Sequence, residues 1–191
     1  MIQLIEKNNF KQMPWKNGKG VTAQIWLSPE GSEFSQGQFH FRMSSASIEK
    51  NEDFSLFPGM ERILIPIKGS GFQLNQDVYE KFEIARFSGD EKMNCTLLKG
   101  AVVDFGIIFN SKIVSINVKI LHLKSAVQFT LEQQNQYFVS VLDGSLIHEN
   151  KSLMSPETLY YFNEPLCRLN VQKSAVVCLS TVISQANNID P

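Results

Sequence analysis

Hydrophobic and polar residues alternate along most of this chain, in short blocks rich in β-branched and aromatic side chains. Such blocks cover residues 39–43, 62–67, 102–109 and 175–183. A period of two is typical of strands, and no long segment shows the 3.6-residue period of a helix. The blocks are separated by turn-forming sequences, namely Asn17-Gly18, Pro58-Gly59, Gly69-Ser-Gly71, Ser88-Gly-Asp90 and Asp143-Gly144. Many short strands divided by turns predict an all-β barrel or sandwich.

The chain also resembles itself at a constant offset of 75 residues, from about 39–108 onto 114–183. Gly69 and Ser70 fall on Gly144 and Ser145, and Phe87 falls on Phe162. Any two β meanders look somewhat alike, but an offset that stays constant over about seventy residues favours an ancient duplication. We therefore expect two related barrel-like halves, residues 1–110 and 111–191, of which the second has a degenerate site.

Positions matched by this offset differ in charge between the two halves. A charged side chain is costly to bury unless it is paired or liganded. The first half has charged residues where the second half has neutral or apolar ones, so we place any chemistry in the first half. The matched pairs are Arg42 with Asn117, Arg62 with Tyr137, Asp90 with Pro165, and Asp104 with Leu179.

Two arginines dominate the candidate site in the first half. Arg42 and Ser44 share one face of their strand, and Arg62 opens another strand. Two guanidinium groups on neighbouring strands would bind a carboxylate through paired hydrogen bonds. The alternatives are a solvated outer face for Arg42, or structural salt bridges from the arginines to Asp90 or Asp104. Phe54 and Phe57 are predicted core anchors.

The glycine-rich segment 13–22 is the other candidate wall of the site. It is either a turn feeding a strand or a loop that points polar groups into a barrel. On the second interpretation, Asn17, Thr22 and Gln24 face the ligand. The predicted ligand-binding residues are Asn17, Thr22, Gln24, Arg42, Ser44, Arg62, Asp90 and Asp104.

Composition narrows the functional classes. The chain has 191 residues, 43% of them hydrophobic, with 18 basic and 19 acidic side chains. It can bury a core, and the balanced charge gives no reason to expect a nucleic-acid partner. No apolar stretch is long enough to span a membrane, and the N-terminus lacks a signal core, so we expect a soluble, cytoplasmic protein.

The sequence contains no motif for a metal site, a cofactor site or a covalent catalytic residue. The three histidines, His40, His122 and His148, lack the spacing of a metal site. The three cysteines have no CxxC spacing and no evident histidine partner. We therefore expect no metal, no cofactor and no covalent catalytic residue.

Four sequence blocks in the first hundred residues together resemble the HutD/Ves family. They are residues 14–22 (PWKNGKGVT), 41–46 (FRMSSA), 54–62 (FSLFPGMER) and 87–90 (FSGD). The resemblance implies a metal-free bicupin, with two fused double-stranded β-helix barrels. It also implies a link to bacterial histidine utilisation, in which such a protein binds a pathway intermediate, formylglutamate among the candidates, and moderates flux or expression. The family's motif positions here would be Trp15, Asn17, Gly18, Gly20, Thr22, Arg42, Ser44, Phe57, Pro58, Gly59, Arg62, Asp90 and Asp104.

The chain departs from the family pattern at three positions. Gln24 stands where Glu is usual, Lys19 where Gly is common, and Gly106 where Asn follows the Asp-aromatic pair. The changes at 24 and 106 remove a carboxylate and an amide from the expected cavity wall. The ligand of this chain therefore need not be that of other members.

Three functional hypotheses follow. The first is a bicupin that binds a small anionic metabolite in its first barrel, in a regulatory or accessory role. The second is a cofactor-free isomerase or hydrolase with Asp104 or Asp90 as general base. The third is a protein-docking surface on the second barrel, where residues 160–162 (Tyr-Tyr-Phe) would contact a partner or form a homodimer.

Overall fold

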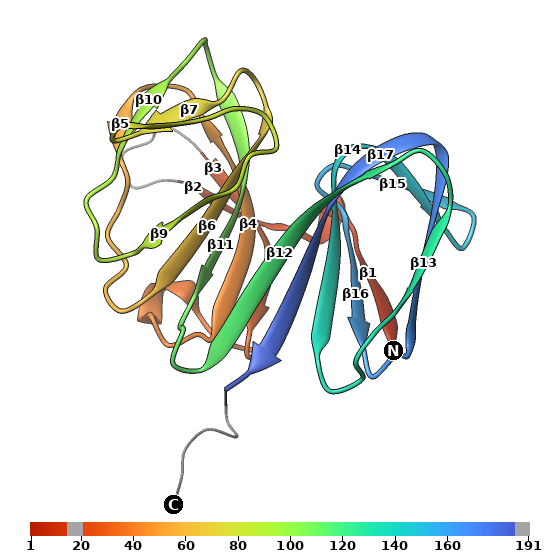
Figure 1. Cartoon of the computed structure of the whole chain (residues 1–191). Helices are drawn as coiled ribbons and strands as arrows, with labels where there is room; N and C mark the ends of the chain where they lie inside the picture. Colours follow the sequence, from red (N-terminus) through yellow and green to blue (C-terminus); the bar gives the residue numbers. More distant parts are fainter. Residues whose placement is uncertain (15–20, 186–191) are drawn as a thin grey trace, which may run out of the picture. The chain divides into compact units, whose positions relative to one another are not determined.

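The computed structural model describes residues 1–14 and 21–185, which form strands and two short 3₁₀ segments, η1 (Lys7–Asn9) and η2 (Phe34–Gln36) (Figure 1). The chain divides into two compact units. We call Phe10–Ser111 the N-terminal unit, and Met1–Asn9 with Lys112–Pro191 the C-terminal unit. Within the described residues, no helix is long and apolar enough to cross a membrane.

The N-terminal unit contains two antiparallel sheets. The larger has the order β2-β3-β4-β11-β6-β9, and the smaller has the order β5-β10-β7-β8. A buried cluster that includes Ile48, Leu64 and Val102 of the larger sheet, and Phe72 and Cys95 of the smaller, joins the two. The larger sheet is made of β2 (Lys11–Pro14), β3 (Val21–Ser28), β4 (Phe41–Ile48), β11 (Val102–Phe109), β6 (Glu61–Lys68) and β9 (Ala85–Ser88); the smaller of β5 (Glu52–Asp53), β10 (Asn94–Leu97), β7 (Phe72–Leu74) and β8 (Asp77–Tyr79).

The C-terminal unit is one seven-stranded sheet of order β1-β16-β14-β17-β12, with β13 added to β17 and β15 added to β14. Its interior is an apolar cluster that includes Tyr137, Val139, Tyr161 and Val177. The strands are β1 (Ile2–Ile5), β12 (Val114–Leu123), β13 (Val127–Thr130), β14 (Gln136–His148), β15 (Lys151–Met154), β16 (Thr158–Phe162) and β17 (Leu166–Ser184).

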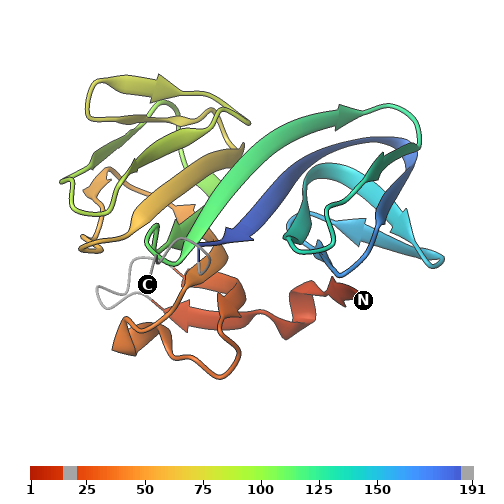
Figure 2. The same ribbon diagram turned by 60° about the horizontal axis from the view of Figure 1, so that its bottom comes forward.

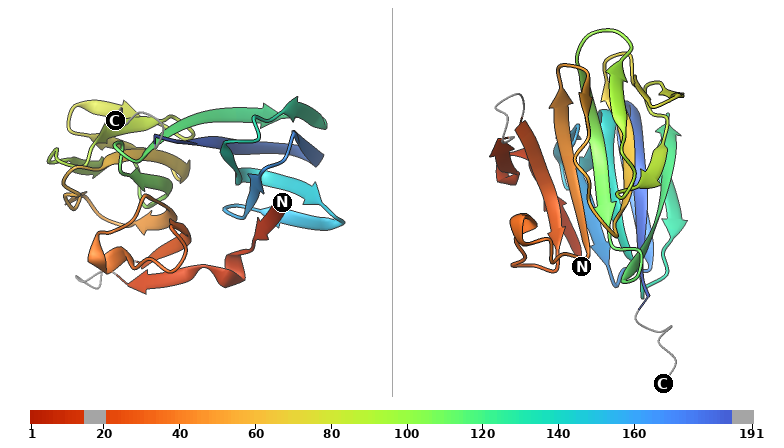
Figure 3. Two further views of the ribbon diagram at one scale, coloured as in Figure 1. Left: turned by 90° about the horizontal axis from the view of Figure 1, so that it is seen from below. Right: turned by 90° about the vertical axis from the view of Figure 1, so that its left-hand side faces the viewer.

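The first nine residues depart from the expected division at residue 110. Strand β1 pairs with β16, so this segment belongs to the C-terminal unit (Figures 2 and 3). The Met1 ammonium group donates to the Phe162 carbonyl oxygen at 2.8 Å and forms an ion pair with Glu164. Backbone pairing across more than 150 residues of sequence thus places the segment, and local patterning could not reveal it.

The two units pair their strands in the same order. The path β4-β11-β6-β9 of one corresponds to β12-β17-β14-β16 of the other. The pairs β5–β10 and β7–β8 likewise correspond to β13–β17 and β14–β15. The expected closed barrels are absent, because the ladders of the described strands end at edge strands. In the N-terminal unit, side chains such as Phe72 fill the space between the sheets and keep them about 10 Å apart, too far for strands to pair.

Gly69 and Gly144 are matched by the 75-residue offset, and both have a positive φ, a backbone conformation that is strained for alanine. Their φ angles are +93° and +70°. A Cβ at Gly69 would overlap the Ala101 carbonyl oxygen, and one at Gly144 the Ser174 carbonyl oxygen. We expect Gly69→Ala and Gly144→Ala each to lower the free energy of unfolding by about 1–3 kcal/mol or more. Gly100→Ala is the control, because Gly100 also has a positive φ (+66°) but has open space around it. If the free energy of unfolding fell equally in all three variants, the carbonyl contacts would have no role.

Candidate functional site

Arg42 and Arg62 lie in one row across the centre of the larger sheet of the N-terminal unit. On β11, Ile108 is directly opposite Arg42 of β4 on one side and Arg62 of β6 on the other. Directly opposed residues project to the same face of a sheet, so both arginines share one face. Their Cα atoms are two strand spacings apart, roughly 10 Å.

A glycine occupies the centre of the next row on this face. Gly106 of β11 lies between Ser44 of β4 and Leu64 of β6. A Cβ on Gly106 would be 3.3 Å from Leu64 Cδ1 and 3.9 Å from Ser44 Oγ. The φ of Gly106 is not positive, so its backbone does not require glycine. The missing side chain instead lets the Leu64 side chain approach the β11 backbone closely, and close approach is a common use of glycine in a strand.

Arg42 is buried, with 5% of its surface exposed, yet its hydrogen bonds go to neutral groups. Its Nε donates to Gln24 Oε1 at 3.1 Å, and its Nη2 lies 3.4 Å from Met13 Sδ. The ring of Phe34 stacks over the guanidinium at 4.0 Å. Burial lowers the pKa of Arg42 to about 10, against the opposing attraction of Asp104. The group therefore remains charged at neutral pH.

Arg62 sits among three aromatic rings. Its Cζ is 5.0–5.2 Å from the ring centroids of Phe54, Phe57 and Phe87, and its Nη1 donates to the Ser55 carbonyl oxygen at 3.1 Å. Burial lowers the pKa of Arg62 to about 10, with Asp104 again opposing. Among the residues that the structure describes, Arg62 Nε and Nη2 and Arg42 Nη1 have no hydrogen-bond acceptor. These donors are available to an anion.

Asp104 occupies the third row of this face, opposite Ala46 and Pro66. It is buried, and its Oδ1 accepts a hydrogen bond from the Ala46 N–H at 3.0 Å. Burial raises the pKa of Asp104 to about 7, although the Ala46 N–H, Arg62 and Arg42 favour the charged form. The alternative of direct salt bridges does not describe this arrangement, because both arginines bond to neutral acceptors.

The other predicted site residues divide into two groups. Thr22, Gln24 and Ser44 lie on or beside these rows, since Thr22 is opposite Ala46 and Gln24 is opposite Ser44. Asp90 does not join them. It is exposed, and both of its carboxylate oxygens accept from the Gly59 N–H at 3.2 Å, so it caps a turn. Asn17 lies outside the described residues.

Sequence reasoning missed the aromatic partners of the arginines. Phe54 and Phe57 were expected as core anchors, and each does pack, half-buried, against a buried hydrophobic cluster, but their contact with Arg62 was not foreseen. Phe34 belongs to η2 in a connecting segment, where no periodicity marks it. The proposed docking patch at residues 160–162 is also corrected: Tyr160 and Tyr161 are buried, and only Phe162 is exposed. Both tyrosine rings pack within the unit, so they form no continuous surface patch.

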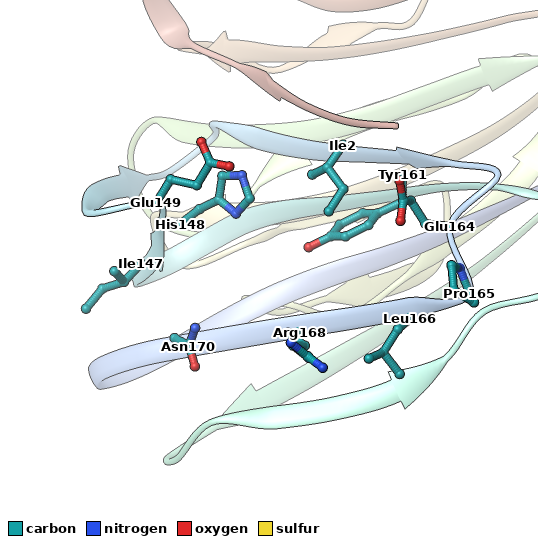
Figure 4. Close-up of a pocket in the computed structure, with 10 residues that line it drawn as sticks. All are labelled: Ile2, Ile147, His148, Glu149, Tyr161, Glu164, Pro165, Leu166, Arg168 and Asn170. Carbon is teal, nitrogen blue, oxygen red and sulfur yellow. The ribbon is translucent and has the colours of Figure 1, made fainter.

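The C-terminal unit holds a different cavity, of about 400 Å³ (Figure 4). Arg168, on its wall, donates through Nε to Gln128 Oε1 at 2.9 Å. The positions matched to Arg62 and Asp104, Tyr137 and Leu179, contribute instead to the apolar cluster of this unit. Among the described residues, no group of three His, Cys, Asp or Glu side chains could hold a metal ion. The cavity is lined by Ile2, Ile147, His148, Glu149, Tyr161, Glu164, Pro165, Leu166, Arg168 and Asn170.

Comparison with known proteins links the chain to one family. A family model described as HutD matches residues 7–179. An uncharacterised 21.2 kDa protein in the hutC 3' region of Pseudomonas putida is 36% identical over 113 residues, and Protein Ves of Citrobacter koseri is 33% identical over 104 residues. These matches cover 56% and 50% of this chain, and only 58% and 52% of those proteins.

Solved structures share the fold over nearly the whole chain. A conserved protein of unknown function from Pseudomonas aeruginosa PAO1 has a TM-score of 0.82 and 24% identity, over 95% of this chain and 98% of that one. HutD from Pseudomonas fluorescens SBW25, in a formate condition, has a TM-score of 0.79 and 23% identity, over 97% and 100%. The Escherichia coli pirin YhhW, in complex with nickel(II), has a TM-score of 0.66 and 10% identity, over 95% and 98%. The fold is therefore all-β and cupin-like.

Proposed function

This chain belongs to the HutD family, and from that premise we propose that its N-terminal unit binds a small anionic metabolite in an accessory or regulatory role. The observation that carries the proposal is the pair of arginines, Arg42 and Arg62, on one face of a sheet, with neutral partners and unused donors. Burying cations without a direct ion pair is costly, and a bound carboxylate would offset that cost. Gly106, which has no side chain, lies between the two arginine strands in the adjacent row of this face.

The first ligands to test are carboxylates of histidine degradation, beginning with formylglutamate. The proposal draws on the Pseudomonas putida relative, whose name places it in the hutC 3' region. It also draws on the charge of the site, because Gln24, rather than a carboxylate, is the hydrogen-bond partner of Arg42 Nε. Two guanidinium groups then face one ionisable acid, Asp104, which favours an anionic ligand.

The fold supports a second part of the proposal, that the units arose by duplication of one cupin-like domain. Both pair their strands in the same order, and the 75-residue offset carries β4 onto β12, β6 onto β14, and β11 onto the end of β17. In this proposal the C-terminal unit has replaced the charged interior with apolar side chains such as Tyr137 and Leu179.

One observation favours an enzyme as the second candidate function. Asp104 is buried on the same face of the sheet as the arginines, and its pKa of about 7 is that of an effective general base near neutral pH. A cofactor-free isomerase or hydrolase acting on the bound acid would use it in that role. Turnover of one of the tested acids that is lost in Asp104→Asn, while binding is retained, would identify the enzyme. Asp90 is exposed and caps the turn at Gly59, so it does not fit this role.

A branched side chain at Gly106 is expected to weaken binding of the ligand, because it would project from the sheet beside the arginine row. In Gly106→Val the added methyl groups would extend from the sheet between Ser44 and Leu64, while the backbone at this position tolerates a side chain. We expect affinity for the tested acid to fall at least about tenfold, with a smaller loss in Gly106→Ala, whose Cβ requires only a small shift of Leu64. Calorimetric titration with formylglutamate, glutamate and urocanate measures the change.

The matched control is Thr181→Val, at the position 75 residues further on, in β17 of the C-terminal unit. It places the same valine at the corresponding strand position, there exchanging only a hydroxyl for a methyl group, and is expected to leave affinity unchanged. If the wild-type protein binds none of the acids, the proposed function fails. If it binds one and Gly106→Val binds it equally well, the location of the site is wrong.

A further inference from the structure

Two half-buried phenylalanines connect the guanidinium groups of the candidate site. Phe34 lies over Arg42, with 4.0 Å between its ring centroid and Arg42 Cζ, and Phe57 lies 5.2 Å from Arg62 Cζ. The centroids of these two rings are 5.7 Å apart. A continuous chain of contacts therefore runs from one arginine, through two rings, to the other.

The stacked ring restricts how Arg42 can receive a ligand. A guanidinium group is planar, and its N–H donors point outward in that plane. The Phe34 ring lies against the guanidinium with its centroid 4.0 Å from Cζ, and Gln24 and Met13 take up Nε and one side of Nη2. The open direction is the edge that carries Nη1, which suits the in-plane approach of a carboxylate with two coplanar oxygens.

The Phe57 ring is itself held in place by the backbone around it. Its segment forms a turn in which the Met60 N–H donates to the Phe57 carbonyl oxygen at 3.0 Å, with Gly59 at φ +73°. The Phe57 N–H donates to the Gly89 carbonyl oxygen at 2.8 Å, and Asp90 accepts from the Gly59 N–H. Asp90 thus reaches the site indirectly, through the turn that carries Phe57.

We propose that Phe34 and Phe57 are positioning residues, which hold Arg42 and Arg62 in the orientation that receives a carboxylate. This inference rests on the proposed anion site and adds to it the groups that fix the geometry of its donors. A ring stacked on a cation attracts it electrostatically and removes rotational freedom of the side chain before the ligand arrives. Because the two rings touch, displacement of one loosens the support of both arginines.

The test separates the aromatic ring from mere apolar volume. Phe34→Leu keeps a half-buried apolar side chain but removes the ring, and Phe34→Tyr keeps the ring. With formylglutamate and glutarate as calorimetric probes, we expect Phe34→Leu to weaken binding about 3- to 10-fold and Phe34→Tyr to bind within about twofold of wild type. Phe57→Leu is expected to act in the same direction. The affinity of the double variant for the probe should fall by less than the product of the two single fold-changes, because both substitutions act through the same contact between the rings.

The control is Phe129→Leu, a half-buried phenylalanine of β13 in the C-terminal unit, which is expected to leave affinity unchanged. A second measurement needs no ligand: the NMR shift of the Arg42 side-chain Nε–H, which the Phe34 ring displaces, should revert in Phe34→Leu and persist in Phe34→Tyr. If the wild type binds a probe and Phe34→Leu binds it equally, the positioning role is overturned while the anion site stands. If the wild type binds neither probe, both the proposed anion site and the proposed positioning role are wrong.

Discussion

Replacing Arg42 with methionine is expected to weaken anion binding about 100-fold or more and to leave the folded protein at least as stable as wild type. Each hydrogen bond from a charged donor to the ligand contributes about 1.5–3 kcal/mol, so loss of a paired contact accounts for a change of this size. Stability should not fall, because Arg42 forms no direct ion pair and the cost of burying its charge outweighs the attraction of Asp104. Replacing buried charge with apolar volume is often neutral or stabilising.

The measurement pairs calorimetric titration with thermal unfolding of the ligand-free protein. Arg168→Met is the matched control, because Arg168 also donates through Nε to a glutamine, Gln128, but is exposed in the C-terminal unit. It is expected to change neither quantity appreciably. An Arg42→Met protein that binds normally, or that unfolds at a much lower temperature, would show that Arg42 supports the fold rather than the ligand.

Periodicity predicted four strand segments, residues 39–43, 62–67, 102–109 and 175–183, which overlap β4, β6, β11 and β17, and it also indicated which side chains share a face. Alternation places Arg42 and Ser44 on the same side of one strand, and the structure adds Gly106 from the neighbouring strand, directly opposite Ser44. The segments that the constant offset matches also pair in the same order in both units. These features depend on neighbours within a strand, or on one repeated pattern, and both are visible in a linear sequence.

Contacts between connecting segments and distant strands were not predictable. Phe34 reaches Arg42 because η2 ends at Gly37, whose left-handed conformation (φ +67°) turns the chain back. Nothing in the local pattern of residues 30–40 specifies that contact. Asp90 carried a charge and was therefore assigned to the site, but its bond to the Gly59 N–H places it at the surface. Charge alone does not distinguish a ligand-binding carboxylate from one that caps a turn.

Asp104 is expected to make the protein less stable as the pH rises from 5 to 8. Its pKa of about 7 in the folded protein compares with 3.8 for an ordinary aspartate, because burial disfavours the charged form. Below pH 4 the Asp104 carboxyl is protonated in both the folded and the unfolded states, so no charge is buried on folding. Between pH 4 and 7 the unfolded chain loses this proton while the folded protein keeps it, so the free energy of unfolding declines with pH. The full difference, reached above pH 7, is on the order of 4 kcal/mol.

Urea unfolding of wild type and Asp104→Asn at pH 5 and pH 8 measures this effect directly. Asparagine resembles the neutral acid and can still accept from the Ala46 N–H, so the variant should be more stable than wild type by about 1–2 kcal/mol at pH 5 and by on the order of 4 kcal/mol at pH 8. Asp53→Asn is the control, since hydrogen bonds from Asn94 and Lys92 lower the pKa of exposed Asp53. The stability that the ionised Asp53 carboxylate contributes is therefore lost only in more acidic solution, and the effect of this variant should be the same at pH 5 and pH 8. Parallel pH profiles for wild type and Asp104→Asn would mean that Asp104 is charged in the folded protein at neutral pH. The interior would then hold a permanent negative charge beside both arginines, and the case for an anionic ligand would weaken with it.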